Sequence, residues 1–148
     1  FGRVEAIPRQ YVIDTLDEVK TWNSAHEYIS ALERLPLGPN IAAMLGHSDI
    51  RTAQMGLDRA TRKEVRPTEA EMAAMEAALR EALDAGFIGM SAQQLLFDKV
   101  DGEQCRSRTL PSTYAKASER RRLNAILRER GRVLQGGPDI TSPRISGR

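Results

Sequence analysis

An unbroken apolar run at residues 41–45 is the feature that most constrains what this chain can fold into. A run without alternation of polar and apolar residues is typical of a strand that is covered on both faces, as parallel strands are. It ends in Gly46, His47 and Ser48 and leads into a polar turn. Functional groups of α/β proteins gather just beyond the carboxyl ends of such strands. The pattern therefore predicts a buried strand over about residues 39–46 that delivers side chains to a functional site.

Predicted helices alternate with predicted strands along the chain. Ser24 and Glu27 have the spacing of a capping box and predict a helix that ends before Pro36. Thr68 and Glu71 repeat that spacing. The remaining elements follow in order: a short helical turn at 48–55, an exposed charged loop at 58–67, a helix at 68–85, a strand at 87–91, a long loop at 92–113, a helix at 118–130 and a strand at 132–136.

Strand, helix, strand, helix, strand in this order predicts a parallel sheet with right-handed crossovers. Three strands are too few for a complete (β/α)8 barrel, which takes about 250 residues. We therefore expect the fold class α/β, with residues 1–148 forming a single βαβαβ segment of a partial (β/α)8, or TIM, barrel and residues 140–148 forming a disordered tail. A small open flavodoxin-like sheet is the alternative, and it would need more strands than the sequence provides.

Length and composition agree with a segment of an ordinary globular protein. The 148 residues are 41% hydrophobic, enough for a core. No apolar run approaches the ~18 residues that span a membrane, and no signal peptide is evident, so we expect a cytoplasmic protein without membrane association. One cysteine and two histidines cannot form the usual four-ligand structural zinc site. Because Phe1 is not a start methionine, we expect the chain to belong to a longer protein, called the parent protein below.

The charge is distributed unevenly along the chain. Residues 1–105 carry 11 basic and 17 acidic side chains, whereas residues 106–148 carry 11 and 3. A basic third can indicate nucleic-acid binding. No aromatic platform or recognised binding motif accompanies the arginines, so the favoured interpretation is a solvated helix face and nucleic acid is not the expected partner. The arginines concerned are Arg120, Arg121, Arg122, Arg128 and Arg130.

Several motifs resemble the amidohydrolase superfamily, in the branch of the N-acyl-D-amino-acid deacylases (D-aminoacylases). The similar stretches are residues 26–38, 40–51, 67–91 and 110–139, and the most specific motifs are Gly46-His47-Ser48-x-x-Arg51, Ala82-Leu83-x-Ala85-Gly86 and Gly89-x-Ser91. The resemblance implies a metal-dependent (β/α)8 hydrolase of non-peptide carbon–nitrogen bonds. In that mechanism a divalent metal, usually zinc, polarises the carbonyl and lowers the pKa of bound water towards about 7.

The chain also departs from that family pattern. It contains no counterpart of the family's His-x-His pair, its cysteine or lysine ligand, or its late aspartate base. Where many relatives end a strand in a metal-binding histidine, residues 135–137 are Gln-Gly-Gly. We therefore assign no metal ligand in this chain and expect zinc or another divalent metal in the parent protein.

Five residues are candidates for the functional site. His47 and Asp139 follow predicted strands and are candidate acid–base residues. For His47 the favoured role is a structural hydrogen bond, and for Asp139 capping of a loop is equally open. Arg51 is a candidate for binding a substrate carboxylate, although an ion pair with Asp49 or Asp58 is favoured. Ser91 and Gln135 complete the candidate substrate-binding residues. Ser91 lacks a Gly-x-Ser-x-Gly elbow, which argues against a nucleophilic role.

The sequence thus favours a parent protein that hydrolyses N-acyl amino acids or a related small amide. The isolated segment is expected to be inactive, and a homo-oligomer is left open. Two alternatives stand beside this interpretation: a non-catalytic basic fragment that binds nucleic acid, and a degenerate barrel piece with a structural role.

Overall fold

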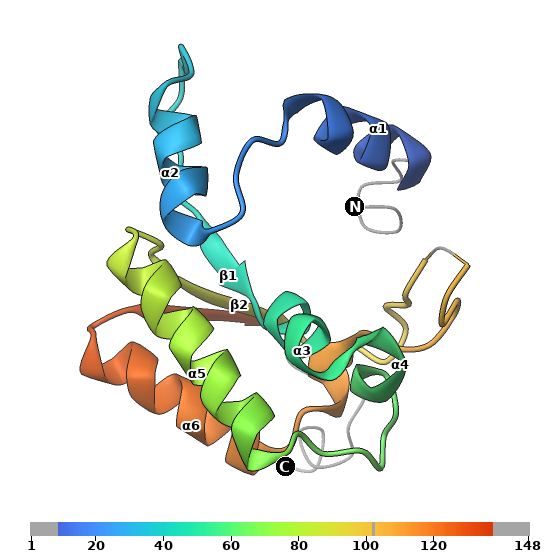
Figure 1. Ribbon diagram of the computed structural model, residues 1–148. Helices are drawn as coiled ribbons and strands as arrows, with labels where there is room; N and C mark the ends of the chain where they lie inside the picture. The colour runs from blue at the N-terminus through green and yellow to red at the C-terminus, as the bar shows by residue number, and fades with distance from the viewer. Residues whose placement is uncertain (1–8, 102, 138–148) are drawn as a thin grey trace.

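The protein is an α/β structure built on a small parallel sheet, as seen in a computed structural model that describes residues 9–101 and 103–137. The strands are β1 (Met44–Gly46), β2 (Gly89–Gln93) and β3 (Val133–Gly137), in the order β1-β2-β3 (Figure 1). Both pairings are parallel. The predicted adjacent, parallel strands in chain order are confirmed. They form an open three-stranded sheet in the described residues, so closure into a barrel remains a proposal.

Two long helices, α5 (Glu69–Asp84) and α6 (Ala117–Glu129), cover one face of the sheet (Figure 1). Thr68 and Glu71 form the predicted capping box at the start of α5. Both helices bury an apolar stripe because their apolar residues recur at helical spacing. These stripes form one core cluster with Met90 of β2, composed of Ile50, Met72, Met75, Leu79, Leu83, Met90, Leu123, Ile126 and Leu127.

Three short elements gather at the carboxyl edge of the sheet: α3 (His47–Met55), α4 (Leu57–Ala60) and the 3-10 helix η1 (Pro111–Tyr114). The predicted turn at 48–55 is a complete nine-residue helix. It ends at Gly56, whose φ of 75° suits glycine. The predicted loop at 58–67 was wrong at its start, because α4 occupies residues 57–60. Between β2 and η1 the described residues contain only an isolated antiparallel bridge, Lys99 to Thr109.

Two helices precede the sheet. Ser24 caps α2 (Ala25–Glu33), where its hydroxyl accepts a hydrogen bond from the backbone N–H of Glu27, as the sequence predicts. The aromatic rings of Trp22, Tyr28 and Phe87 form a chain with centroid separations of 5.3 and 5.9 Å, which links this region to the entry of β2. The helix α1 (Arg9–Val19) was not predicted.

The predicted strand boundaries need correction. The first strand begins at Met44 and not near residue 39, because its partner strand β2 begins only at Gly89. Before these residues the two segments share a single backbone hydrogen bond, from the N–H of Ile88 to the carbonyl of Ala43. The second strand is displaced towards Gln93. Ile41, without a partner strand, is 53% exposed.

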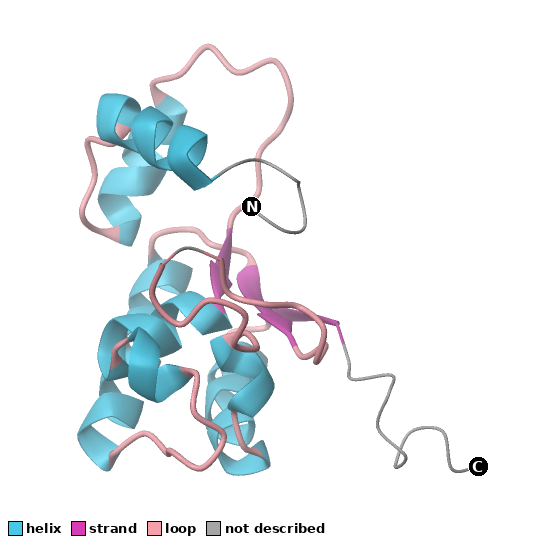
Figure 2. Ribbon diagram, turned by 90° about the vertical axis from the view of Figure 1, so that its right-hand side faces the viewer, coloured by secondary structure: helices cyan, strands magenta, loops and turns pink. Residues whose placement is uncertain are grey.

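The second face of the sheet carries no packed helix in the described part of the chain, and in Figure 2 the helices that cover the sheet lie on one side of it. Val133 points to this open face and is 53% exposed. None of the helices among the described residues is both long and apolar enough to cross a membrane.

Candidate functional site

The carboxyl edge of the sheet brings together side chains from segments far apart in the sequence. Successive residues of a strand point to opposite faces, and residues paired in a parallel register share a face. Leu45, Met90 and Leu134 form one register row, on the helix-covered side where Met90 is buried. The next row is Gly46, Ser91 and Gln135, which therefore lies on the open face. Gly46 ends β1, whereas Ser91 and Gln135 are the middle residues of β2 and β3. The row therefore lies just before the carboxyl ends of the strands, beyond which α/β proteins bind ligands.

Ser91 and Gln135, which the sequence singled out separately, are thus register partners on adjacent strands. Ser91 is half-buried, whereas Gln135 is exposed. The structure brings these two candidates together. The candidate Asp139 lies outside the described residues.

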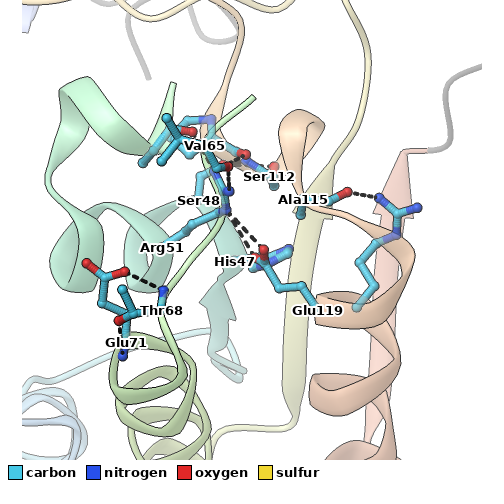
Figure 3. A network of polar contacts seen from close by, with 12 residues as sticks. His47, Ser48, Arg51, Val65, Thr68, Glu71, Ser112, Ala115 and Glu119 are labelled. Atoms are coloured by element: carbon cyan, nitrogen blue, oxygen red, sulfur yellow. Dashed lines mark hydrogen bonds and ion pairs between the residues drawn. The ribbon is translucent and has the colours of Figure 1, made fainter. Parts of the chain in front are cut away.

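His47 lies on the helix-covered side, at the first position of α3, and is completely buried. Its Nε2 is 2.9 Å from Oε1 of Glu119 on α6 (Figure 3). The Nε of Arg51 also donates to Glu119, at 3.1 Å from Oε1 and 3.3 Å from Oε2. The three side chains form a buried cluster between α3 and α6, called the His47–Arg51–Glu119 cluster below.

The electrostatics of this cluster favour an ionised Glu119. Burial alone would raise the pKa of Glu119, but the hydrogen bond with His47 and the positive charge of Arg51 outweigh burial and hold the pKa below its ordinary value of 4.5. An ionised carboxylate only accepts hydrogen bonds, so Nε2 of His47 carries the proton that it shares with Glu119. The Nδ1 of His47 is buried without a hydrogen-bond partner among the described residues.

Arg51 also connects the loops at the carboxyl edge of the sheet through hydrogen bonds. Its guanidinium donates to the backbone carbonyls of Ala60, Pro111 and Val65, which belong to three different segments. The prediction that Arg51 forms an ion pair with Asp49 or Asp58 was wrong, because its carboxylate partner is Glu119. A guanidinium offers five donors in a fixed fork, which suits this bridging position.

A second polar chain joins α3 to η1 and β2. Ser48 Oγ donates to Ser112 Oγ at 2.8 Å (Figure 3). Ser112 Oγ in turn donates to the backbone carbonyl of Gln93. Ser112 is completely buried. These bonds hold the end of β2 against η1.

The described residues do not fit a metal centre. Among residues 9–101 and 103–137 no group of three or more histidine, cysteine, aspartate or glutamate side chains could hold a metal ion. A catalytic zinc takes three protein ligands. The His47–Glu119 pair supplies two, and the guanidinium of Arg51 already occupies the same carboxylate.

Of the five arginines that the sequence analysis names in the basic third, three contact other protein groups. Arg122 pairs with Glu69 and Glu76 of α5, and Arg130 pairs with Asp84. Arg120 donates to the carbonyl of Ala115. Carboxylates of α5 therefore neutralise part of this helix face.

Sequence reasoning missed Glu119 and Ser112. Glu119 carried a detectable signal: it lies four residues before Leu123 and so continues the apolar stripe of α6, where a charged residue needs a buried partner. Ser112 carried none, because its role depends on the path of a long loop.

Comparisons with known proteins place the chain within a longer protein. Uncharacterized proteins of Mycobacterium bovis and Mycobacterium tuberculosis are 55% identical to it over 143 residues, which is 97% of this chain. The chain spans 23% of the length of these curated relatives. A D-aminoacylase of Alcaligenes xylosoxydans is 38% identical over 82 residues, 53% of this chain and 16% of that protein. No family model matches the chain, and no solved structure does.

Proposed function

We propose that this chain is a segment of a hydrolase that acts on the carbon–nitrogen bond of a small N-acyl amino acid. The observation that carries the proposal is the 38% identity to a D-aminoacylase over 82 residues. The parallel βαβαβ arrangement, with the polar side chains of Ser91 and Gln135 paired on the open face of its sheet, supports it. In the reaction water adds to the amide carbonyl, the carbon–nitrogen bond breaks, and a carboxylate and an amine leave.

In this proposal the segment forms part of the wall of a (β/α)8 barrel whose other strands come from the parent protein. The open face of the sheet is then the barrel interior, and Ser91 and Gln135 contact the substrate there. We propose Asp139, two residues beyond β3, as a candidate acid–base carboxylate.

His47 and Arg51 take positioning roles in this proposal. Both point to the helix-covered side, and both are engaged by Glu119 in the interior of the segment. They hold in place the loops that border the proposed substrate site. Contact with the substrate is assigned to Ser91 and Gln135 on the open face.

A divalent metal, zinc by resemblance to the family, is proposed for the parent protein. The described residues of this chain do not fit it, so its ligands are proposed to lie elsewhere in the parent sequence. The proposed binding partner of the parent protein is its substrate, a small-molecule amide.

The test is hydrolysis by the purified parent protein. N-acyl-D-amino acids, their L-enantiomers and a short peptide are each incubated with it, and free amino acid is quantified by chiral chromatography. We expect release from an N-acyl-D-amino acid and a lower rate with the L-enantiomer. Ser91→Ala and Gln135→Ala should lower kcat/KM, whereas Gly136→Ala, on the helix-covered side, should not. No release from any N-acyl amino acid would refute the proposed function.

A further inference from the structure

Gln93 lies on the same face of the sheet as the two candidate substrate contacts. It is two residues beyond Ser91 on β2, so both side chains leave the same side of the strand. Gly137 is its register partner on β3, two residues beyond Gln135. Gln93 therefore stands one step nearer the carboxyl edge than the row of Ser91 and Gln135, and it is half-buried.

The backbone at Gln93 is held from two sides. Its carbonyl accepts hydrogen bonds from the hydroxyls of Ser112 and Thr113, at 2.5 and 3.4 Å. The next N–H, that of Gln94, donates to the carbonyl of Gly137 at 3.0 Å. A side chain on such a fixed support loses little further freedom when it binds a ligand.

The missing side chain of Gly137 provides space for the Gln93 carboxamide. A Cβ atom placed on Gly137 would come within 1.9 Å of Oε1 of Gln93. The carboxamide therefore lies across β3, in the direction of the strand that carries Gln135.

The side chains gathered here are uncharged. Ser91, Gln93 and Gln135 offer hydroxyl and carboxamide groups, and Arg51 is occupied by Glu119 on the other side of the sheet. A substrate carboxylate is held best by a guanidinium, whereas a neutral amide is matched by a carboxamide, which both donates and accepts.

We propose that Gln93 is a further substrate-contacting residue, whose carboxamide oxygen accepts a hydrogen bond from the amide N–H of the N-acyl amino acid. The inference rests on the proposed function and adds a specificity determinant to it. It explains why a glycine stands opposite Gln93 on β3. A site built to bond an N–H discriminates against an analogue without it, because the buried acceptor is left unpaired.

The experiment compares two substrates in the parent protein. One is the N-acyl-D-amino acid, and the other is the matching O-acyl-D-2-hydroxy acid, whose ester oxygen replaces the amide nitrogen. Wild type is compared with Gln93→Met, which keeps the length of the side chain without the acceptor oxygen. Gln93→Leu, which keeps the branched shape and also lacks the acceptor, takes its place with the same expected result should the methionine variant unfold. Gln104→Met, in the exposed part of the loop, is the matched control.

We expect Gln93→Met to lower kcat/KM about three- to tenfold for the amide, mainly through KM, and to leave kcat/KM for the ester within twofold of wild type. Equal losses for both substrates, or no loss for the amide, would overturn the inference while wild-type hydrolysis leaves the proposed function standing. If wild type hydrolyses neither substrate, the proposed function fails and this inference fails with it.

Discussion

At the scale of single residues, the His47–Arg51–Glu119 cluster is the part of the structure most sensitive to change. Removing Glu119 would leave a buried guanidinium without its carboxylate. Breaking a buried ion pair from one side costs about 3–5 kcal/mol, because the remaining charge is uncompensated. We expect Glu119→Ala to lower the free energy of unfolding of the parent protein by this amount in urea denaturation. Glu129→Ala, which removes an exposed partner of Arg80, should change it little.

The same cluster predicts a pH dependence. Because the folded-state pKa of Glu119 lies below its ordinary value of 4.5, its stabilising contribution is complete above that value and is lost as the pH falls towards the lower folded-state pKa. The difference in stability between wild type and Glu119→Gln should therefore shrink when the pH falls below about 4.5. A difference that stays constant through this pH range would contradict an ionised Glu119.

Gly89 is the second sensitive residue, because the backbone of β3 passes against it. A Cβ at this position would lie 2.0 Å from the carbonyl oxygen of Val133, so β2 and β3 would have to separate. Overpacking typically costs about 1–3 kcal/mol. We expect Gly89→Ala to lower the melting temperature of the parent protein by several degrees. Gly136→Ala is the matched control, since its nearest neighbour would be 3.8 Å away. Equal melting temperatures of the two variants would show that the strands do not approach as described.

At the scale of elements, local signals predicted what local interactions determine. The capping box of Thr68 and Glu71 and the apolar stripe that follows fixed α5 to within a residue, because both act within a few turns of one helix. The extent of β1 depends instead on where β2 begins. A strand boundary of this kind is set by a partner more than forty residues away, and the sequence around residue 40 contains no signal for it.

The candidate site shows the same division. Ser91 and Gln135 could be proposed from strand ends alone, and their adjacency follows from the parallel register. The pairing of Arg51 with Glu119 could not be proposed from the sequence, because it depends on how α6 packs on α3. Gln93 was missed because β2 extends further than its short apolar run indicates.

The arginines of α6 give a prediction at this scale. Arg122 and Arg130 are already paired with carboxylates of α5, which reduces the positive charge that this helix face can offer to phosphate. We expect weak binding of a labelled DNA or RNA duplex that disappears by about 0.15 M salt, since each phosphate contact depends on counterion release. The measurement is fluorescence anisotropy during a salt titration. Binding that persists at this salt and falls in Arg120/Arg121/Arg122→Ala would favour the nucleic-acid alternative.

At the scale of the whole molecule, the exposed apolar side chains around the sheet indicate that further residues of the parent protein are needed to complete the structure. Four large apolar side chains near the sheet are between 39% and 53% exposed: Ile41, Ile88, Val133 and Leu134. Burying one such side chain contributes about 1.5–3 kcal/mol, and a whole domain is stable by only about 5–15 kcal/mol. Leaving several uncovered is therefore a substantial loss. A chain that spans 23% of its curated relatives leaves ample sequence to cover these side chains.

The most direct test of this account is the binding of an environment-sensitive hydrophobic dye to the 148-residue chain and to the parent protein at equal molar concentration. Exposed apolar surface binds such dyes. We predict a strong rise in fluorescence with the isolated chain and little with the parent protein, because in the proposed barrel the rest of the parent protein covers the open face and both edges of the sheet. An isolated chain that binds no dye, and remains a cooperatively melting monomer, would contradict the claim that these residues are a segment of a larger barrel.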